Sequence, residues 1–216
     1  MLSAMTVEYP KFLEFLSNLY LCKPTKEAIE NWKVLLSEGA PQSIWGLKEA
    51  IDNIDLNSEQ ELEDLLWEYT RLFIGPYKLP CPPWESVYTS AKKLMMQEAY
   101  DKVASFYKEI GLDINNPDIM ADHIGAELNF MAILLQKISH EPERRLYYMD
   151  MSKNFLNEHL VRWAPQFTLD MEGATNSKFY KALAQVTRNF IIELKNGSLE
   201  TPYLGCSHAF LRRTTD

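Results

Sequence analysis

The segment from Tyr69 to Tyr88 decides the fold, because helical sequence precedes and follows it but cannot continue through it. It reads Y-T-R-L-F-I-G-P-Y-K-L-P-C-P-P-W-E-S-V-Y. Each proline fixes φ and removes a backbone donor. The prolines of this segment are Pro76, Pro80, Pro82 and Pro83. We therefore predict a stiff, largely extended connection whose aromatic side chains either complete the core, as composition favours, or form a preorganised ligand surface.

The rest of the sequence predicts helices. Hydrophobic residues make up 46% of the 216 positions, only 8 residues are Gly, and no alternating strand pattern occurs. The 3.6-residue spacing of apolar side chains indicates helices over residues 8–21, 26–36, 41–51, 58–73, 86 or 89 to 110, 117–138, 141–163 and 176–197. The segment from 167 to 175 reads as irregular. The predicted class is all-α, a single globular domain of about eight to ten helices.

Two helical halves are predicted within that domain. The N-terminal half spans residues 1–111 and includes the Pro-rich loop. A hinge at 112–117 leads to a C-terminal half at 118–197, and residues 198–216 form a tail. A short hinge between helical halves permits domain swapping, so monomer and swapped dimer both stay open.

Charge and cysteine usage exclude several classes of protein. The formal net charge of −8 argues against nucleic acid as a partner, because phosphate binding needs a basic face. Cys22, Cys81 and Cys206 are far apart and fit neither a disulfide framework nor a zinc site, which favours a reducing cytoplasm. We read no signal peptide and no run of about 18 apolar residues, so no membrane span is predicted.

The unit Asp122-His123-x-x-x-Glu127 carries the most suggestive chemistry. In a helix over 117–138, Glu127 falls on the apolar stripe and His123 on its flank, where the two side chains can touch. A carboxylate on an apolar face must be paired, hydrogen-bonded or functional. The residues alone favour a polar contact between helices over an anionic spot that receives a cation.

Catalytic and cofactor motifs give no positive signal. No Glu-x-x-His unit occurs, so no metal is predicted, and no Gly-rich phosphate loop is present. Ser86 has no recognisable base partner, and His159 reads as packing or as a charge at a helix C-terminus. We therefore predict no catalytic residue, no metal and no cofactor.

Three stretches together resemble the TorD/DmsD-type redox-enzyme maturation chaperones. The first is Y-x-x-L-F-I-G-P from Tyr69, continued by L-P-C-P-P-W-E-S-V-Y to Tyr88. The second is Asp122-His123-x-x-x-Glu127-Leu128, and the third is His159-Leu160-x-x-Trp163. The first is the most specific, and together they cover the chain from about residue 60 to residue 195.

The resemblance implies an all-helical cytoplasmic chaperone. Such proteins bind the twin-arginine signal peptide of the catalytic subunit of a molybdopterin oxidoreductase and delay its export until the cofactor is inserted. Some members bind guanine nucleotide weakly, and some form domain-swapped dimers. The resemblance implicates these residues in peptide binding: Tyr69, Leu72, Phe73, Pro83, Trp84, Glu85, Tyr88, Asp122, His123 and Glu127.

The residue types agree with that implication. A twin-arginine peptide presents two guanidinium groups followed by an apolar run, which call for carboxylates and an aromatic groove. We expect the carboxylates to be Glu85, Asp122 and Glu127. We expect the groove to be lined by Phe73, Trp84 and Tyr88, while Leu72 and Val87 pack inside.

Two further classes of function stay open beside the chaperone. One is a helical hydrolase that uses Asp122 and His123, and the other is an interaction scaffold without a role in folding. A separate hypothesis concerns the C-terminal Phe210-Leu211-Arg212-Arg213, which carries the residue types of the peptide. It either docks in the groove or is a loose tail.

Overall fold

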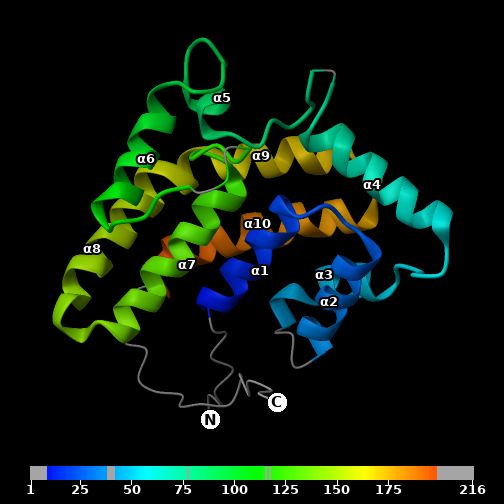
Figure 1. Cartoon of the computed structure of the whole chain (residues 1–216), viewed down its shortest axis with the longest axis horizontal. Coiled ribbons are helices and arrows are strands. Elements are labelled where there is room, and N and C mark those ends of the chain that lie inside the picture. The colour runs from blue at the N-terminus through cyan, green and yellow to red at the C-terminus, as the bar shows by residue number, and fades with distance from the viewer. Residues whose placement is uncertain (1–8, 38–41, 77, 115, 117, 199–216) are drawn as a thin grey trace.

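The computed structural model describes residues 9–37, 42–76, 78–114, 116 and 118–198 (Figure 1). The predicted tail from residue 199 onward, with the segment from Phe210 to Arg213, lies outside the described residues. Positions 115 and 117 of the predicted hinge lie outside them as well.

The described residues form an all-α fold, as predicted. The helices are α1 (Tyr9–Leu21), α2 (Lys26–Ser37), α3 (Trp45–Asp52), α4 (Glu59–Phe73), α5 (Glu85–Thr89), α6 (Glu98–Glu109), α7 (Ile124–His140), α8 (Arg145–Phe155), α9 (Val161–Ala174) and α10 (Lys178–Glu193). Short 3₁₀ turns at Gln42–Ile44 and Pro142–Arg144 and π-helical turns at Leu156–Leu160 and Leu194–Ser198 join them. Within this part of the chain, the one β-type contact is an isolated bridge between Trp84 and His123.

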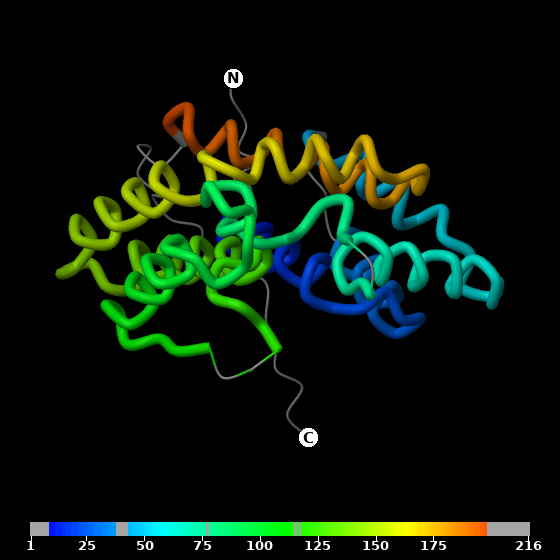
Figure 2. The backbone as a smooth tube through the Cα atoms, turned by 90° about the horizontal axis from the view of Figure 1, so that it is seen from above, coloured from blue at the N-terminus to red at the C-terminus, as the bar shows by residue number. Residues whose placement is uncertain are grey.

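The helices of the two predicted halves pack directly on each other. Helix α1 lies along α7, and α10 lies along α9 and also contacts α3 (Figure 1). Seen from above, α4 lies toward one end of the molecule and α6 and α8 toward the other (Figure 2). The division into halves with a hinge between them stays a prediction.

The contact between α1 and α7 depends on Gly125. A Cβ atom at this position would lie 2.5 Å from Cγ of Leu21. The Ser17 hydroxyl donates a hydrogen bond of 2.7 Å to the Gly125 carbonyl across the same contact. The first turn of α7 is therefore fixed against α1 at a distance that only a glycine permits.

Several predicted helix boundaries are confirmed. The Ser58 hydroxyl accepts the Glu61 amide at 3.3 Å, as a capping residue does. Helix α10 follows Ser177 as its N-cap.

The predicted helix over 86–110 is wrong, because it is broken between Thr89 and Glu98. The Gln97 amide donates to the Ser86 hydroxyl at 3.2 Å, and the Gln97 side chain donates to the carbonyls of Met95 and Met96. These side-chain bonds offer the backbone an alternative to the helical ladder.

The predicted helix start at residue 117 is also wrong. The Asn116 side chain accepts the Asp118 amide at 3.0 Å, which closes a local turn instead of capping a helix. Helix α7 begins only at Ile124, so His123 is its N-cap and is not inside it.

The predicted break before Pro165 and the irregular segment at 167–175 are wrong, because α9 continues to Ala174. Helix α9 directly follows the π-helical turn Leu156–Leu160. Pro165 lies near the start of this helix, where it removes one backbone donor. Buried Trp163 and Phe167, whose rings pack 5.5 Å apart, hold this part of the helix in the core.

Replacing Gly125 with Ala should lower the free energy of unfolding by about 1–3 kcal/mol, because the new methyl group overpacks the contact with Leu21. Urea unfolding measures the change. The control is Gly173→Ala, whose methyl group meets open space and should stabilise α9 by about 0.5–1 kcal/mol. Equal unfolding midpoints for the two variants would contradict the close contact.

Candidate functional site

The Pro-rich loop is bonded to the residues that lead into α7. The Ile124 amide donates to the Pro83 carbonyl, and the Glu85 amide donates to the Asp122 carbonyl, both at 2.9 Å. These two hydrogen bonds form an antiparallel bridge that places Trp84 opposite His123. The centroids of the two rings are 6.3 Å apart. We call residues 83–86 and 121–124 the junction.

Asp122 strengthens the junction with its side chain. Its carboxylate accepts the Ser86 amide at 2.9 Å and also accepts the Ser86 hydroxyl, both through Oδ2. The Ser86 hydroxyl in turn accepts the Gln97 amide. One buried carboxylate therefore fixes the start of α5 and, through Ser86, the end of the following loop. Burial raises the pKa of Asp122, and the bonds from Ser86 oppose that rise.

Glu85 forms a buried pair with His159. Oε2 of Glu85 lies 2.7 Å from Nδ1 of His159, and both side chains are buried. The imidazole ring packs against Phe106 and Phe155, with centroids 5.4 and 5.0 Å away. Of the two interpretations of His159, packing is confirmed and a helix-end charge is wrong, because its ring points into the core from the π-helical turn Leu156–Leu160.

Glu127 lies fully inside the protein. Its Oε2 accepts the indole N–H of Trp163 at 3.1 Å. Burial, and next the negative charge of Glu85, raise the pKa of Glu127 well above its usual range, which favours the protonated form. We call Glu85, Asp122 and Glu127 the acid cluster.

The predicted contact between the side chains of His123 and Glu127 is wrong. His123 caps α7, and its Nδ1 accepts the Gly125 amide at 3.0 Å. Loss of solvent lowers the pKa of His123 to about 4, so the ring is neutral at pH 7 and Nδ1 is free to accept.

The predicted site residues separate into buried and partly exposed groups. Tyr69, Leu72 and Phe73 lie in the core, with Phe73 packed on Tyr69 and Tyr180. The expectation that Phe73 lines an open groove is therefore wrong, whereas the expected packing of Leu72 is confirmed. Pro83 is buried too.

Trp84, Tyr88 and His123 are the partly exposed members of the predicted set. The Tyr88 ring packs on Trp163 and Phe167, with centroids 5.5 and 6.2 Å away. This packing fixes the orientation of the Tyr88 ring, two residues after the junction.

The three carboxylates do not lie on an open surface. The exposed fractions are 1% for Glu85 and 0% for Asp122 and Glu127. The apolar stripe predicted for Glu127 faces the interior of the fold, and the junction covers the other two. Direct contact between these carboxylates and arginine would require the junction to open, and it stays a prediction.

Sequence reasoning missed three partners of the acid cluster: Ser86, His159 and Trp163. The spacing of His159 and Trp163 places both on one helix face, which is a usable signal. Their pairing with Glu85 and Glu127 is a long-range contact that no local pattern shows.

Among the described residues, no group of His, Cys, Asp or Glu is arranged to hold a metal ion. Nor is any described helix long and apolar enough to cross a membrane.

The all-α fold has a counterpart among solved structures. A crystal structure with a similar all-α fold is that of a putative redox enzyme maturation protein from Archaeoglobus fulgidus. It has a TM-score of 0.61 and 22% identity and covers 89% of this chain and 96% of that one.

The nitrate reductase delta subunit family matches residues 33–169, which contain both sides of the junction. The chain belongs to this family, and the resemblance drawn from the three motifs is confirmed.

Named relatives agree with the family. The probable Tat proofreading chaperone DmsD of Haemophilus influenzae is 31% identical over 126 residues, which are 58% of this chain and 57% of that protein. The chaperone protein TorD of Aliivibrio salmonicida is 25% identical over 206 residues, or 88% of this chain and 94% of that protein. The match therefore spans a little under three fifths of the length of this DmsD relative.

Replacing Glu127 with Gln should stabilise the protein increasingly as the pH rises, because Gln keeps an acceptor for Trp163 but has no charge to bury. A carboxyl whose pKa is raised by folding contributes stability below its unfolded pKa and loses that contribution as the pH rises toward the folded pKa. Urea unfolding at pH 4, 6 and 8 measures the difference between variant and wild type.

The control for this experiment is Glu172→Gln. Hydrogen bonds from Gln185 and Arg188 lower the pKa of Glu172, so its contribution is present above the unfolded pKa and lost as the pH falls. The control should therefore lose stability relative to wild type as the pH rises. A pH-independent effect of Glu127→Gln would contradict the burial of an ionisable carboxyl.

Proposed function

We propose that the protein is a cytoplasmic assembly chaperone for a molybdopterin oxidoreductase. In this proposal it binds the twin-arginine signal peptide of the catalytic subunit and delays export until the cofactor is inserted. Support comes from the family and from relatives whose names describe Tat proofreading and TorD chaperones. The observation that carries the proposal is the junction, which fixes partly exposed Trp84 and His123 directly above buried acids.

The junction has the chemistry that such a peptide requires. Aromatic rings held by backbone bonds and by packing contact an apolar segment at little cost in conformational entropy. The net charge of −8 attracts a cationic peptide over a distance. Both features exist before any ligand binds, so the surface is preorganised.

The proposal divides the predicted site residues by position. Trp84, Tyr88 and His123 contact the peptide. The acid cluster fixes the junction from inside, with direct contact only if the junction opens. The remaining members support the loop from the core, and they are Tyr69, Leu72, Phe73 and Pro83.

Asp122 and His123 are poorly placed for the hydrolase alternative. The Asp122 carboxylate is bonded to Ser86, and Nδ1 of His123 is used to cap α7. A general base needs a free acceptor within reach of a substrate proton. Binding therefore fits these two residues better than catalysis. Weak guanine-nucleotide binding and a domain-swapped dimer, which the resemblance implies for some members, stay predictions.

Wild-type protein should bind a synthetic twin-arginine signal peptide, and changing both arginines to lysine should weaken binding about tenfold or more, because lysine lacks the planar fork. Trp84→Ala should cause a similar loss, as expected for a central aromatic contact. Isothermal titration calorimetry measures both effects.

The matched control is Trp67→Ala, which removes the same side chain from a 65% exposed position on α4 and should leave affinity unchanged. Equal affinity of the wild-type protein for the arginine and lysine versions of the peptide would contradict the proposed function. Full-strength binding to a client subunit that lacks its signal peptide would instead support an interaction scaffold.

A further inference from the structure

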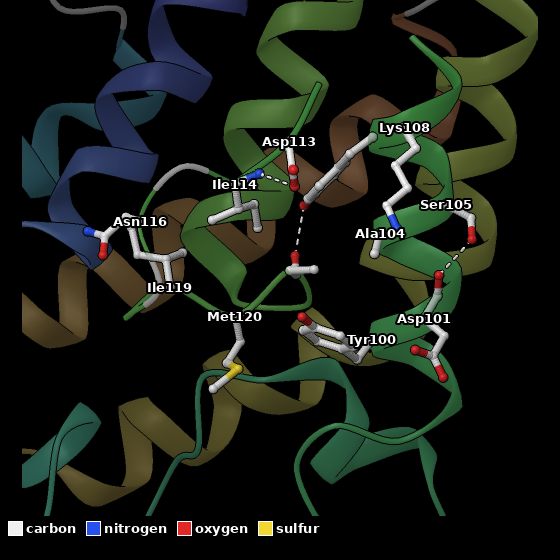
Figure 3. Close-up of a pocket in the computed structure, with 12 residues that line it drawn as sticks. Tyr100, Asp101, Ala104, Ser105, Lys108, Asp113, Ile114, Asn116, Ile119 and Met120 are labelled. Carbon is white, nitrogen blue, oxygen red and sulfur yellow. Dashed lines mark hydrogen bonds between the residues drawn. The ribbon is translucent and has the colours of Figure 1, made fainter. Parts of the chain in front are cut away.

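An open cleft lies beside the junction, between α6 and the residues that precede α7 (Figure 3). Its volume is about 350 Å³. The residues that matter for its chemistry are Tyr100, Asp101, Tyr107, Asp113, Met120 and Ala121.

We propose that this cleft is a binding subsite for a guanidinium group. The inference rests on the proposed function, in which one of the two arginines of the signal peptide would supply that group. It places the arginine beside the acid cluster and leaves the cluster itself buried.

The charges around the cleft favour a cation. Asp101 and Asp113 are both exposed, and neither carboxylate forms an ion pair with a described residue. Asp113 accepts the Ile114 amide at 2.9 Å through one oxygen. Lys108 is the single cation among the lining residues, so the lining carries two carboxylates against one ammonium group.

One member of the acid cluster lies next to the cleft lining, because Asp122 directly follows Ala121. The Tyr107 hydroxyl donates to the Ala121 carbonyl at 2.8 Å, and both residues line the cleft. Burial raises the pKa of Tyr107, and negative charge at the nearby carboxylates raises it further. The exposed carboxylates of Asp101 and Asp113, and not the buried Glu127, supply the charge that stabilises a cation in the cleft.

The residue types that line the cleft suit a guanidinium better than an ammonium group. A planar guanidinium stacks on an aromatic ring such as that of Tyr100 while its edge donates to carboxylates. Asp101 lies one position after Tyr100, and the two line the cleft together. Charge-assisted, forked hydrogen bonds of this kind are stronger than neutral ones.

The first test uses the full chain and the twin-arginine peptide in calorimetry. Asp101→Asn should weaken binding about tenfold and reduce the preference for arginine over lysine. The control Asp150→Asn removes the same charge from an exposed position on α8 outside the cleft. Equal losses of peptide affinity in the two variants would mean that only the net charge of the protein matters, and this result would overturn the subsite.

The second test does not depend on the signal peptide. Titration with N-acetyl-arginine methylamide, followed by NMR, should give saturable shifts at Tyr100 and Asp101 that weaken in Asp101→Asn. N-acetyl-lysine methylamide should bind more weakly. Absence of saturable shifts overturns the subsite even if the peptide binds elsewhere. Saturable shifts with no peptide binding support the subsite and refute the proposed function.

Discussion

The buried Asp122 carboxylate, which accepts two hydrogen bonds from Ser86, is the interaction on which the rest of the site depends. Together with the backbone bonds at Pro83 and Glu85, it joins the Pro-rich loop to the start of α7. A buried charge costs free energy unless it is hydrogen-bonded, so its partners must stay in place. The rigid loop is therefore a consequence of Asp122 as much as of its prolines.

Local sequence patterns were sufficient for much of the fold. The spacing of apolar residues predicted α1, α2 and α10, and it also predicted α4 with its start near residue 58. Local patterns failed where tertiary bonds override propensity. The helix predicted over this segment is broken before Gln97, because the Gln97 amide donates to the hydroxyl of Ser86, 11 residues earlier in the chain. Pro165 does not end a helix whose flanking aromatic residues are buried.

The candidate site was predicted in composition but not in arrangement. The motifs correctly brought the Pro-rich loop and the Asp122 segment together, and Glu127 on an apolar stripe is indeed interior. A helical wheel cannot show which partner satisfies a buried carboxylate, so the pairs with His159 and Trp163 were missed. Nor does it show that the carboxylates are covered, which changes their proposed role from direct ligands to groups that hold the junction from inside.

The central claim is that the junction and the cleft beside it form one surface for a twin-arginine peptide. Hydrogen exchange of the full chain, with and without the peptide, tests it most directly, because amide protection maps contact and local stabilisation. The account predicts new protection at residues 84–88 and 119–125 and along the first turns of α6, with α2 and α3 unchanged. Protection confined to other helices, or none in the presence of bound peptide, would contradict it.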